Sequence, residues 1–323
     1  MLTKYSETDF VELISKGVPM KPIVSVGMCL RNCENTLRGA IDSVIKQDFP
    51  HELMEIIFVD DGSEDGTSQL ILDYVSRMDI NSKIFRTNWK GLGPARNVVV
   101  NNADGDYIVW VDGDEILPEH YVRKQVEFME QNPSVGITAG IFGMLPGNIV
   151  LNLELIPAII DHIRYDKPKT FIWKTEKFPG TGGATFRVKA LRQVNGFDDH
   201  LKGVGEDQDV ARRMKYAGWL IRLNDAVFYE RHGGMSALKD LWNKYFWYGY
   251  GNQNLYRKNR KLFSLPRMSP PAGFIAGFFY SLIAYKLLHC KIVFLLPFHF
   301  ALKMTAWSLG FIKSQILHNK SEK

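Results

Sequence analysis

The sequence lacks several features that would assign it to a familiar class of protein. Its 323 residues include only three cysteines, Cys29, Cys33 and Cys290. They form no Cys-x-x-Cys pair and no His/Cys metal spacing, so we expect neither a disulfide framework nor a zinc site and favour a reduced, cytosolic compartment. The first eleven residues carry no apolar run, so we expect no signal peptide. A net charge of +5 is too small to indicate a nucleic-acid partner.

The glycine-rich loops that usually bind phosphate are missing too, because neither a P-loop nor a Gly-x-Gly-x-x-Gly motif occurs. The first half of the chain instead alternates β-branched apolar runs with amphipathic stretches. This alternation predicts a parallel α/β sheet with right-handed crossovers, in which ligands bind beyond the carboxyl ends of the strands. We expect strands at 23–28, 55–59, 83–86 and 107–111, and helices at 36–46, 67–75 and 94–101.

Two carboxylates follow the strand expected at 107–111. Asp112 and Asp114 flank Gly113, and because residues two apart in an extended chain point the same way, both carboxylates can face one spot. Close carboxylates repel each other unless a cation lies between them, and Mg²⁺ or Mn²⁺ takes such oxygen ligands while bridging to phosphates. The other interpretation is an ordinary Asp-Gly turn at the end of a strand.

Asp60 and Asp61 follow the strand expected at 55–59. A carboxylate at this position can accept hydrogen bonds from a ribose or a nucleobase, although a turn that caps the next helix explains the same residues. Arg96 opens the helix expected at 94–101, where free backbone N–H groups and a guanidinium suit a phosphate. A solvated surface arginine is the commoner case in proteins.

An acidic cluster at 205–209 precedes a helix expected at 210–217. Acidic side chains there complement the helix dipole, but one of these carboxylates can also act as a general base that deprotonates an acceptor hydroxyl. His232 follows a short strand expected at 226–229. An isolated histidine is usually structural, but it can also complete a metal site.

The end of the chain is apolar and basic. The stretches 272–289 and 292–311 are each about as long as a bilayer span, and a basic run at 257–261 precedes them. Basic flanks on both sides fit a hairpin with both ends cytoplasmic. Lys286 and Lys303 argue against a clean pair of spans, so helices that lie in one leaflet are a second interpretation. Two core helices of a soluble domain are a third.

Seven motifs occur in order along residues 21–235: GMCLRNCENTLRGAIDSVIKQ, EIIFVDDGSEDGT, GPARN, YIVWVDGDEILPE, GGATFRVKALRQVNGFDD, GEDQDVARRMKYAGW and ERHGG. Together they resemble family 2 glycosyltransferases. The resemblance implies an α/β fold of the GT-A, nucleotide-diphospho-sugar transferase type, with a mostly parallel sheet, helices on both faces and, here, C-terminal hydrophobic helices.

The resemblance also implies a nucleotide-binding role for matching residues at the strand ends. Family members often read Pro-x-Tyr-Asn after the first strand, where this chain has Cys29-Leu30-Arg31-Asn32, and this departure leaves the nucleobase contacts of that loop open. The residues implied to bind the nucleoside or diphosphate are Asn32, Asp60, Asp61, Arg96 and Asp112.

For the chemistry, Asp112 and Asp114 resemble the DxD motif that holds Mg²⁺ or Mn²⁺ on the diphosphate, and His232 resembles a histidine that joins the metal. Asp207 resembles the catalytic base. The QxxRW signature of processive polysaccharide synthases is absent after Asp207. We therefore favour addition of single sugars over polymerisation.

These observations predict a metal-dependent enzyme that moves a sugar from a nucleotide-diphosphate donor to a lipid-linked or glycan acceptor. One base without a second nucleophile implies inversion. A nucleotidyltransferase with the same Asp pair and metal, and a non-catalytic membrane-bound scaffold, are the rival hypotheses. We expect an N-terminal extension (1–20), a catalytic domain (21–235), an aromatic and basic connector (236–269) and a membrane-associated tail (270–323). The enzyme is expected at the cell membrane with its catalytic domain on the cytoplasmic side.

Overall fold

The computed structural model divides the chain into two compact units, which are described separately. The sheet unit comprises Met1–Gly143, Lys169–Lys202 and Glu206–Arg231, and the helical unit comprises Met144–Pro168, Gly203–Gly205 and His232–Lys323. The four ranges expected from the sequence stay a prediction. The residues that the structure describes are 10–14, 20–143, 148–164, 171–172, 180–201, 203–230, 237–258, 260 and 264–321.

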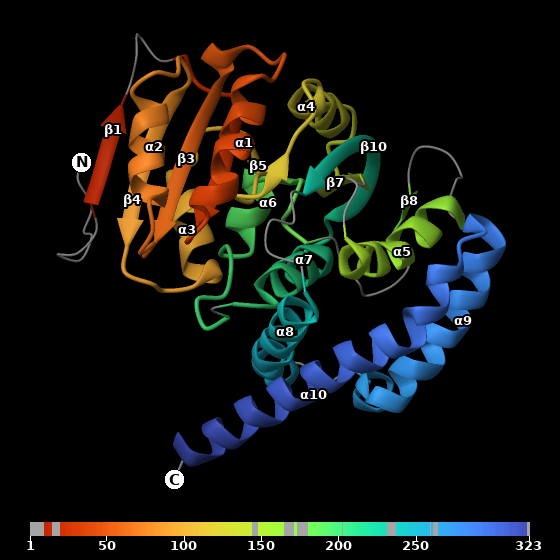
Figure 1. Cartoon of the computed structure of the whole chain (residues 1–323). Coiled ribbons are helices and arrows are strands. Elements are labelled where there is room, and N and C mark those ends of the chain that lie inside the picture. Colours follow the sequence, from red (N-terminus) through yellow and green to blue (C-terminus); the bar gives the residue numbers. More distant parts are fainter. Residues whose placement is uncertain are drawn as a thin grey trace. The chain divides into compact units, whose positions relative to one another are not determined.

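The sheet unit is built on one sheet with the strand order β1-β4-β3-β2-β5-β9-β7-β10-β6, to which β8 adds by pairing with β10 (Figure 1). The strands are β1 (Phe10–Ile14), β2 (Val24–Leu30), β3 (Met54–Asp61), β4 (Asn81–Thr87), β5 (Tyr107–Trp110), β6 (Glu115–Ile116), β7 (Val135–Gly143), β8 (Phe171–Ile172), β9 (Ala184–Arg187) and β10 (Leu220–Glu230).

The strands β4, β3, β2 and β5 pair in parallel. Of these four, β2 comes first in the chain and lies between β3 and β5, so the chain winds to one side of β2 and then to the other. In open α/β sheets, ligands bind at the carboxyl ends of the strands where the winding reverses. Asn32, Asp61 and Asp112 lie at or just beyond the carboxyl ends of β2, β3 and β5.

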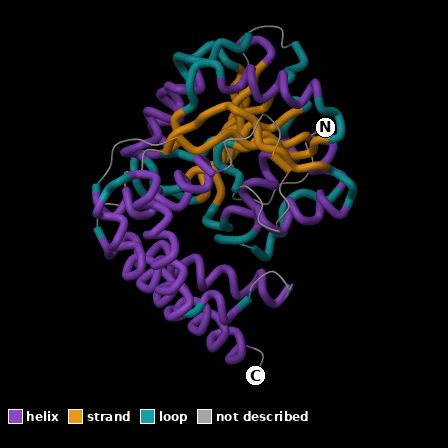
Figure 2. The backbone as a smooth tube through the Cα atoms, turned by 90° about the vertical axis from the view of Figure 1, so that its right-hand side faces the viewer, coloured by secondary structure: helices purple, strands orange, loops and turns teal. Residues whose placement is uncertain are grey.

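Helices cover both faces of the sheet (Figure 2). Ile56 and Phe58 of β3 pack with α1, α2 and α4, whereas Ile57 and Val59 enter a second core with α3, α6 and α7. All of β3 is buried, as expected for a parallel strand covered on both faces. The α/β fold predicted from the sequence is confirmed. The helices are α1 (Glu34–Ile45), α2 (Thr67–Val75), α3 (Leu92–Asn102), α4 (Tyr121–Gln131), α6 (Val188–Gln193) and α7 (Glu206–Tyr216), with a 3-10 turn η1 (His51–Leu53).

The elements expected in the first half of the chain are all present, and their ends lie within two residues of the expected ones. One difference affects the site. The strand expected at 55–59 continues through Asp60 and Asp61, because these residues pair with Arg86 and Thr87 of β4. The two carboxylates therefore belong to a strand and not to a loop.

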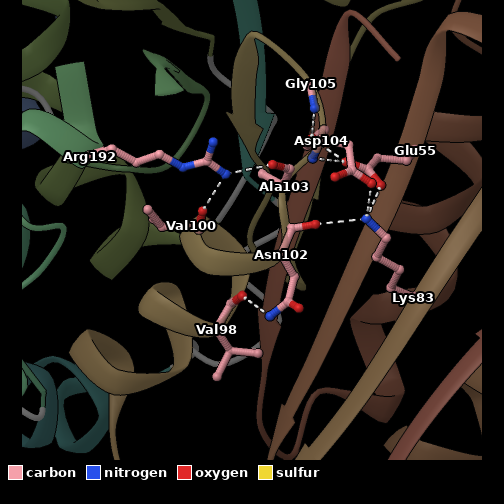
Figure 3. A network of polar contacts seen from close by, with 10 residues as sticks. Glu55, Lys83, Val98, Val100, Asn102, Ala103, Asp104, Gly105 and Arg192 are labelled. Carbon is pink, nitrogen blue, oxygen red and sulfur yellow. Dashed lines mark hydrogen bonds and ion pairs between the residues drawn. The ribbon is translucent and has the colours of Figure 1, made fainter. Parts of the chain in front are cut away.

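An ionic network ties the strands together at their opposite ends, near the amino ends of β2 and β3 (Figure 3). The Nζ atom of Lys83 lies 2.7 Å from Glu55 Oε2 and 2.6 Å from Asp104 Oδ2, and it donates to the Asn102 carbonyl at 2.7 Å. Glu55 Oε1 accepts from Ser25 Oγ at 2.6 Å. The network is structural, since the candidate site residues lie at the other ends of these strands.

The helical unit contains α5 (Ile149–Arg164), α8 (Leu238–Lys258), η3 (Leu265–Met268), α9 (Pro270–Leu288), η4 (Lys291–Leu295) and α10 (Leu296–Ser321). Helix α10 packs against both α9 and α8 (Figure 1). Two segments, Pro270–Leu288 and Lys291–Asn319, are long and apolar enough to cross a membrane. Because a core helix passes the same test, this finding is only a weak sign of membrane association.

Candidate active site

The carboxylate of Asp61 holds the loop between β4 and α3. Its Oδ1 accepts from the Lys90 N–H at 2.7 Å and from Thr87 Oγ1 at 3.1 Å, and its Oδ2 accepts from the Gly91 N–H at 2.8 Å. Asp61 is buried. Its bonds to the protein fix a loop at the edge of the site, while its predicted contact with a nucleoside stays a prediction.

Asp60 and Asn32 hold the two neighbouring loops in the same way. Asp60 Oδ1 accepts from the Ser63 N–H at 2.9 Å, and its Oδ2 accepts from the hydroxyl of Ser68. The Asn32 N–H donates to Ser63 Oγ at 3.0 Å, and Asn32 Oδ1 accepts from the Glu64 N–H at 2.8 Å. Asn32 has φ 49°, a left-handed conformation that asparagine tolerates better than most residues. The loops after β2 and β3 therefore form one connected rim.

This rim borders a pocket of about 430 Å³ that the sequence reasoning did not find. The guanidinium of Arg31 lies over the ring of Trp89, 5.0 Å from its centroid, and half of the Trp89 surface is exposed. The signal in the sequence is a tryptophan two residues after the end of β4. A larger pocket of about 740 Å³ lies along α1 and residues 116–119, and none of the predicted site residues lines it. The smaller pocket is lined by Arg31, Gly62, Ser63, Glu64, Arg86, Thr87, Asn88 and Trp89.

The segment from Asp112 to Glu115 is a turn and not extended chain, since the Glu115 N–H donates to the Asp112 carbonyl at 3.1 Å. The assumption that Asp112 and Asp114 lie in an extended chain, which would point both side chains the same way, was therefore wrong. Gly113 is required by close packing, because a Cβ there would lie 2.8 Å from Cys33 Sγ. The turn itself presents both aspartates, half-buried, at the carboxyl end of β5.

Glu115 is a further site residue that the sequence reasoning missed. Its Oε2 accepts from the backbone N–H groups of Asp112 at 2.9 Å and Gly183 at 3.2 Å, while its buried Oε1 has no hydrogen-bond partner among the described residues. A Cβ on Gly182 would lie 2.1 Å from that oxygen, so a larger residue there would have to displace the Glu115 side chain. Burial, with the charge of Asp112 beside it, raises the pKa of Glu115 well above the ordinary range.

Arg96 is buried at the start of α3 and pairs with Glu206 at the start of α7. Its guanidinium also lies over the rings of Trp110 and Phe197, at 5.9 and 5.7 Å. Burial alone would lower the pKa of Arg96, but the charges of Glu206, Asp112 and Asp207 raise it. The structure therefore gives Arg96 a protein partner, and its predicted contact with a diphosphate stays a prediction.

Asp207 lies in the first turn of α7, where its Oδ1 accepts from the Gln208 N–H at 2.7 Å. Burial, followed by the negative charge of Glu206, raises the pKa of Asp207 to about 7, and Arg96 opposes this shift. A pKa near 7 suits a group that must accept a proton at neutral pH. The helix expected at 210–217 starts earlier, at Glu206, so both acids belong to its first turn.

The short segment 180–183 lies beside two of the candidate carboxylates, Asp112 and Asp207. A Cβ on Gly180 would lie 3.4 Å from Asp207 Oδ2, and a Cβ on Gly182 would lie 3.6 Å from Asp112 Oδ2. Two glycines that are two residues apart thus leave room beside each carboxylate.

The residues present fit a hard divalent cation. Asp112 and Asp114 offer carboxylate oxygens, and Glu115 Oε1 adds a buried oxygen without a partner in the described ranges. Those ranges contain no cluster of three His, Cys, Asp or Glu side chains arranged around a metal. A cation here would thus depend on water and substrate phosphate for its other ligands, as Mg²⁺ often does. His232, the third predicted ligand, lies outside the described residues.

Comparison with known proteins gives concordant matches. The model of the family described as Glycosyl transferase family 2 matches residues 25–194. The chain is 30% identical over 103 residues to the poly(ribitol-phosphate) beta-N-acetylglucosaminyltransferase TarS of Staphylococcus aureus, covering 32% of this chain and 18% of TarS. It is 36% identical over 113 residues to the putative glycosyltransferase EpsE of Bacillus subtilis, covering 34% of this chain and 40% of EpsE. The matches thus span less than half of either relative.

Solved structures share the fold. A crystal structure of S. aureus TarS residues 1–349 has a TM-score of 0.51 at 17% identity and covers 91% of both chains. The mannosyltransferase PcManGT from Pyrobaculum calidifontis, in complex with GDP-Man and Mn²⁺, has a TM-score of 0.60 at 17% identity, covering 92% of this chain and 88% of that one. At such low identity these structures support the fold alone.

Proposed function

Because the chain belongs to glycosyl transferase family 2, we propose that it moves a sugar from a nucleotide-diphosphate donor to a hydroxyl of a lipid-linked or glycan acceptor, with inversion and with a divalent metal. The observation that carries this proposal is the arrangement around residues 180–183. Asp112 and Asp207, the latter with a pKa of about 7, each lie beside a glycine of this segment. A donor bound over the segment would have the metal-binding carboxylate of Asp112 near its diphosphate and the base Asp207 near its sugar.

The chemistry assigned to this chain is one displacement. Asp207 accepts the proton of the acceptor hydroxyl while that oxygen forms a bond to the anomeric carbon, and the bond from this carbon to the diphosphate oxygen breaks. Since the oxygen enters opposite the leaving group, the anomeric configuration inverts. The base has to be ionised to accept the proton, so its pKa sets the lower pH limit of the reaction.

Asp112 and Asp114 would hold Mg²⁺ or Mn²⁺, which when bound neutralises charge on the diphosphate leaving group. Glu115 supports this turn through its bond to the Asp112 N–H. Two proteins of similar fold are described in complexes with Mn²⁺: PcManGT with GDP-Man, and GalNAc-T7 with UDP and GalNAc, the latter at a TM-score of 0.53. Their metal supports the proposal for this chain without establishing it.

The donor's nucleoside is assigned to the pocket beside Asp61. Trp89 offers an exposed aromatic face there, backed by the guanidinium of Arg31. The Asp61 carboxylate fixes the backbone on the far side of Trp89, at Lys90 and Gly91. Stacking on an aromatic ring binds any base, so this platform gives affinity more than choice of base.

We also propose that the enzyme acts at the cell membrane with its catalytic unit on the cytoplasmic side. The two apolar helical segments of the helical unit support membrane association. Basic residues that precede them support the cytoplasmic orientation.

Two rival functions stay distinguishable by experiment. A nucleotidyltransferase would release pyrophosphate and not a nucleoside diphosphate, and a non-catalytic scaffold would release neither. We propose incubating the full-length protein with a panel of UDP- and GDP-sugars, with and without Mn²⁺, and identifying the released nucleotide. Release of nucleoside diphosphate that requires metal and is lost in Asp114→Ala is the expected result. Undiminished turnover in chelator would contradict the metal-dependent mechanism.

A further inference from the structure

Helix α9 has its small residues inside and its large apolar residues outside. Its buried residues are Gly273, Gly277, Ser281 and Ala284. In water such an arrangement leaves a large part of the biggest apolar side chains exposed, so they contribute less to folding than they would if buried. In lipid it is normal, because small residues let helices approach closely while large apolar side chains face the acyl chains. The exposed large residues are Phe274 (41%), Ile275 (56%), Phe278 (50%), Phe279 (59%), Leu282 (42%) and Tyr285 (39%).

The small residues are needed for the contact between α9 and α10. A Cβ on Gly273 would lie 2.9 Å from the Phe300 carbonyl, and a Cβ on Gly277 would lie 2.6 Å from the Leu296 carbonyl. A larger residue at either position would push the two helices apart. The exposed apolar surface of α9 is thus tied to a defined packing and is not the result of a loose helix.

Helix α10 also exposes large apolar residues, near its start and again in its second half. Phe298, Leu309, Ile312 and Ile316 follow one another at helical spacing and are 46–66% exposed. Phe294 and Leu295 extend the surface onto η4, at 46% and 44% exposure. The large apolar residues of α9, η4 and α10 together form what we call the apolar surface of the helical unit.

The opposite face of α10 packs against helices that carry polar residues. A Cβ on Gly310 would lie 1.9 Å from the Phe246 carbonyl of α8, and one on Gly249 of α8 would lie 1.8 Å from the Trp307 carbonyl. Ser314 Oγ contacts Gln253 Oε1 of α8 at 3.5 Å. The second half of α10 is therefore fastened to a helix rich in charge and amides, which hydrocarbon would not surround.

A buried ionic cluster marks the same inner face nearer the start of α10. Glu154 of α5 lies 2.6 Å from Lys303 Nζ and 2.9 Å from His299 Nε2, and it accepts from the Tyr245 hydroxyl. Burial by itself would raise the pKa of Glu154, but these partners lower it to about 2. The carboxylate is therefore ionised. Lys303 pairs with it inside the helical unit, on the side of α10 that faces away from the apolar surface.

The charge of this region suits anionic lipid. Residues 241–321 contain eleven Lys and Arg and no Asp or Glu. Among them, Lys286 and Lys291 lie on either side of the junction between α9 and η4, and both are exposed. Long basic side chains at the ends of an apolar surface reach up to headgroup phosphates.

We propose that the apolar surface lies in one leaflet of an anionic bilayer and that neither α9 nor α10 crosses the membrane. This inference rests on the membrane association in the proposed function and adds its geometry. The exposed residues Phe298, Leu309, Ile312 and Ile316 lie on one face of α10, and the opposite face is fastened to α5 and α8. A helix with this division of faces lies parallel to the membrane plane, whereas a crossing helix needs hydrocarbon-compatible surroundings over its full length.

The native Cys290 provides the test, since it is exposed at the junction between α9 and η4. Full-length protein is added to sealed vesicles of phosphatidylcholine with or without phosphatidylglycerol, floated, and treated outside with a membrane-impermeant maleimide. Cys290→Ser supplies the background from Cys29 and Cys33. We expect flotation that increases with phosphatidylglycerol, and modification of Cys290 without detergent. Modification only after detergent would overturn the proposal, because a crossing hairpin carries Cys290 to the lumen.

Substitutions test whether lipid or another partner covers the apolar surface. Phe278→Asp should weaken partitioning into vesicles by roughly tenfold or more, since burying one phenylalanine side chain is worth about that factor. Leu72→Asp, on an exposed apolar residue of the sheet unit, should leave partitioning unchanged. A soluble dimer that does not float, and that Phe278→Asp converts to a monomer, would overturn the proposal in favour of a second copy. Nucleotide binding in the same samples tests the catalytic assignment independently of flotation.

Discussion

Arg96 and Glu206 form a buried ion pair that joins the start of α3 to the start of α7, one residue before Asp207. The pair places a positive and a negative charge beside the candidate base. Glu206 raises the pKa of Asp207 and Arg96 lowers it. Because buried charges act on each other through a medium of low polarity, a change in either partner should reach Asp207.

We therefore expect Glu206→Gln to shift the pH dependence of the reaction. With a pKa of about 7 for Asp207, kcat/KM should rise with pH up to about 7 as the base ionises. Removing the Glu206 charge lowers the pKa of Asp207, so the acidic limb should move to lower pH. The measurement is a pH profile of kcat/KM for wild type and variant. Asp209→Asn, which removes an acid paired with Arg213 on the same helix, is the matched control. An acidic limb at the same pH in Glu206→Gln would contradict this coupling.

Asp207→Asn tests whether Asp207 acts as a catalytic base or only caps its helix. Asparagine caps helices about as well as aspartate, so a purely structural role predicts nearly full activity. A catalytic role predicts unchanged nucleotide affinity with turnover reduced roughly 10²–10⁴-fold. Binding by calorimetry and turnover with the same donor distinguish the two. Product from the wild-type enzyme should carry the inverted configuration at the anomeric carbon, and retention would overturn the single displacement.

Trp89→Ala tests the nucleoside pocket. Stacking of a base on an aromatic side chain is worth about 1–3 kcal/mol, so the dissociation constant of the nucleoside diphosphate should rise by roughly tenfold or more. Trp89→Phe should recover most of the affinity because it keeps an aromatic face. Trp247→Ala, which removes an exposed tryptophan of the helical unit, serves as the control. Equal affinities for all of these proteins would show that the base binds elsewhere.

Glu55→Gln tests the ionic network near the amino ends of the strands. The substitution leaves Lys83 in its partly buried position with only Asp104 as an ionic partner, so the free energy of unfolding should fall by about 2 kcal/mol, the value of one hydrogen bond to a charged group. Turnover of the folded enzyme should not change, because the network lies away from the carboxyl ends of the strands. Urea denaturation followed by tryptophan fluorescence measures the loss. Lys21→Met removes a solvent-exposed ion pair with Asp106 and should have almost no effect.

The positions of several candidate site residues could be predicted from the sequence because they follow from strand order. Once β2, β3 and β5 are recognised as parallel strands, their carboxyl ends have to meet, and Asp61 and Asp112 come with them. The neighbours that pack around these residues could not be read in the same way. Glu115 acts through backbone N–H groups of Asp112 and of Gly183, which lies 68 residues later, and no local pattern encodes that contact.

Arg96 shows a different limit. Its place at a helix start, with glycines nearby, predicted an anion ligand, and the structure supplies an anion from the protein itself, Glu206. The same electrostatic preference serves a phosphate and a carboxylate equally well. Only the tertiary fold determines which one is near. Trp89 was missed for the opposite reason, because a lone aromatic residue after a strand has no periodicity that marks it as part of a pocket.

The sequence by itself determined the alternation of strands and helices, the carboxyl edge at which polar residues collect, and the apolar, basic character of the last 80 residues. These are local properties, set by side-chain period and composition. The tertiary structure alone decided the partner of Arg96, the burial behind the raised pKa of Asp207, and which apolar residues of α10 are exposed. Each of these depends on groups far apart in the chain, whose distances are fixed only when the helices and strands pack.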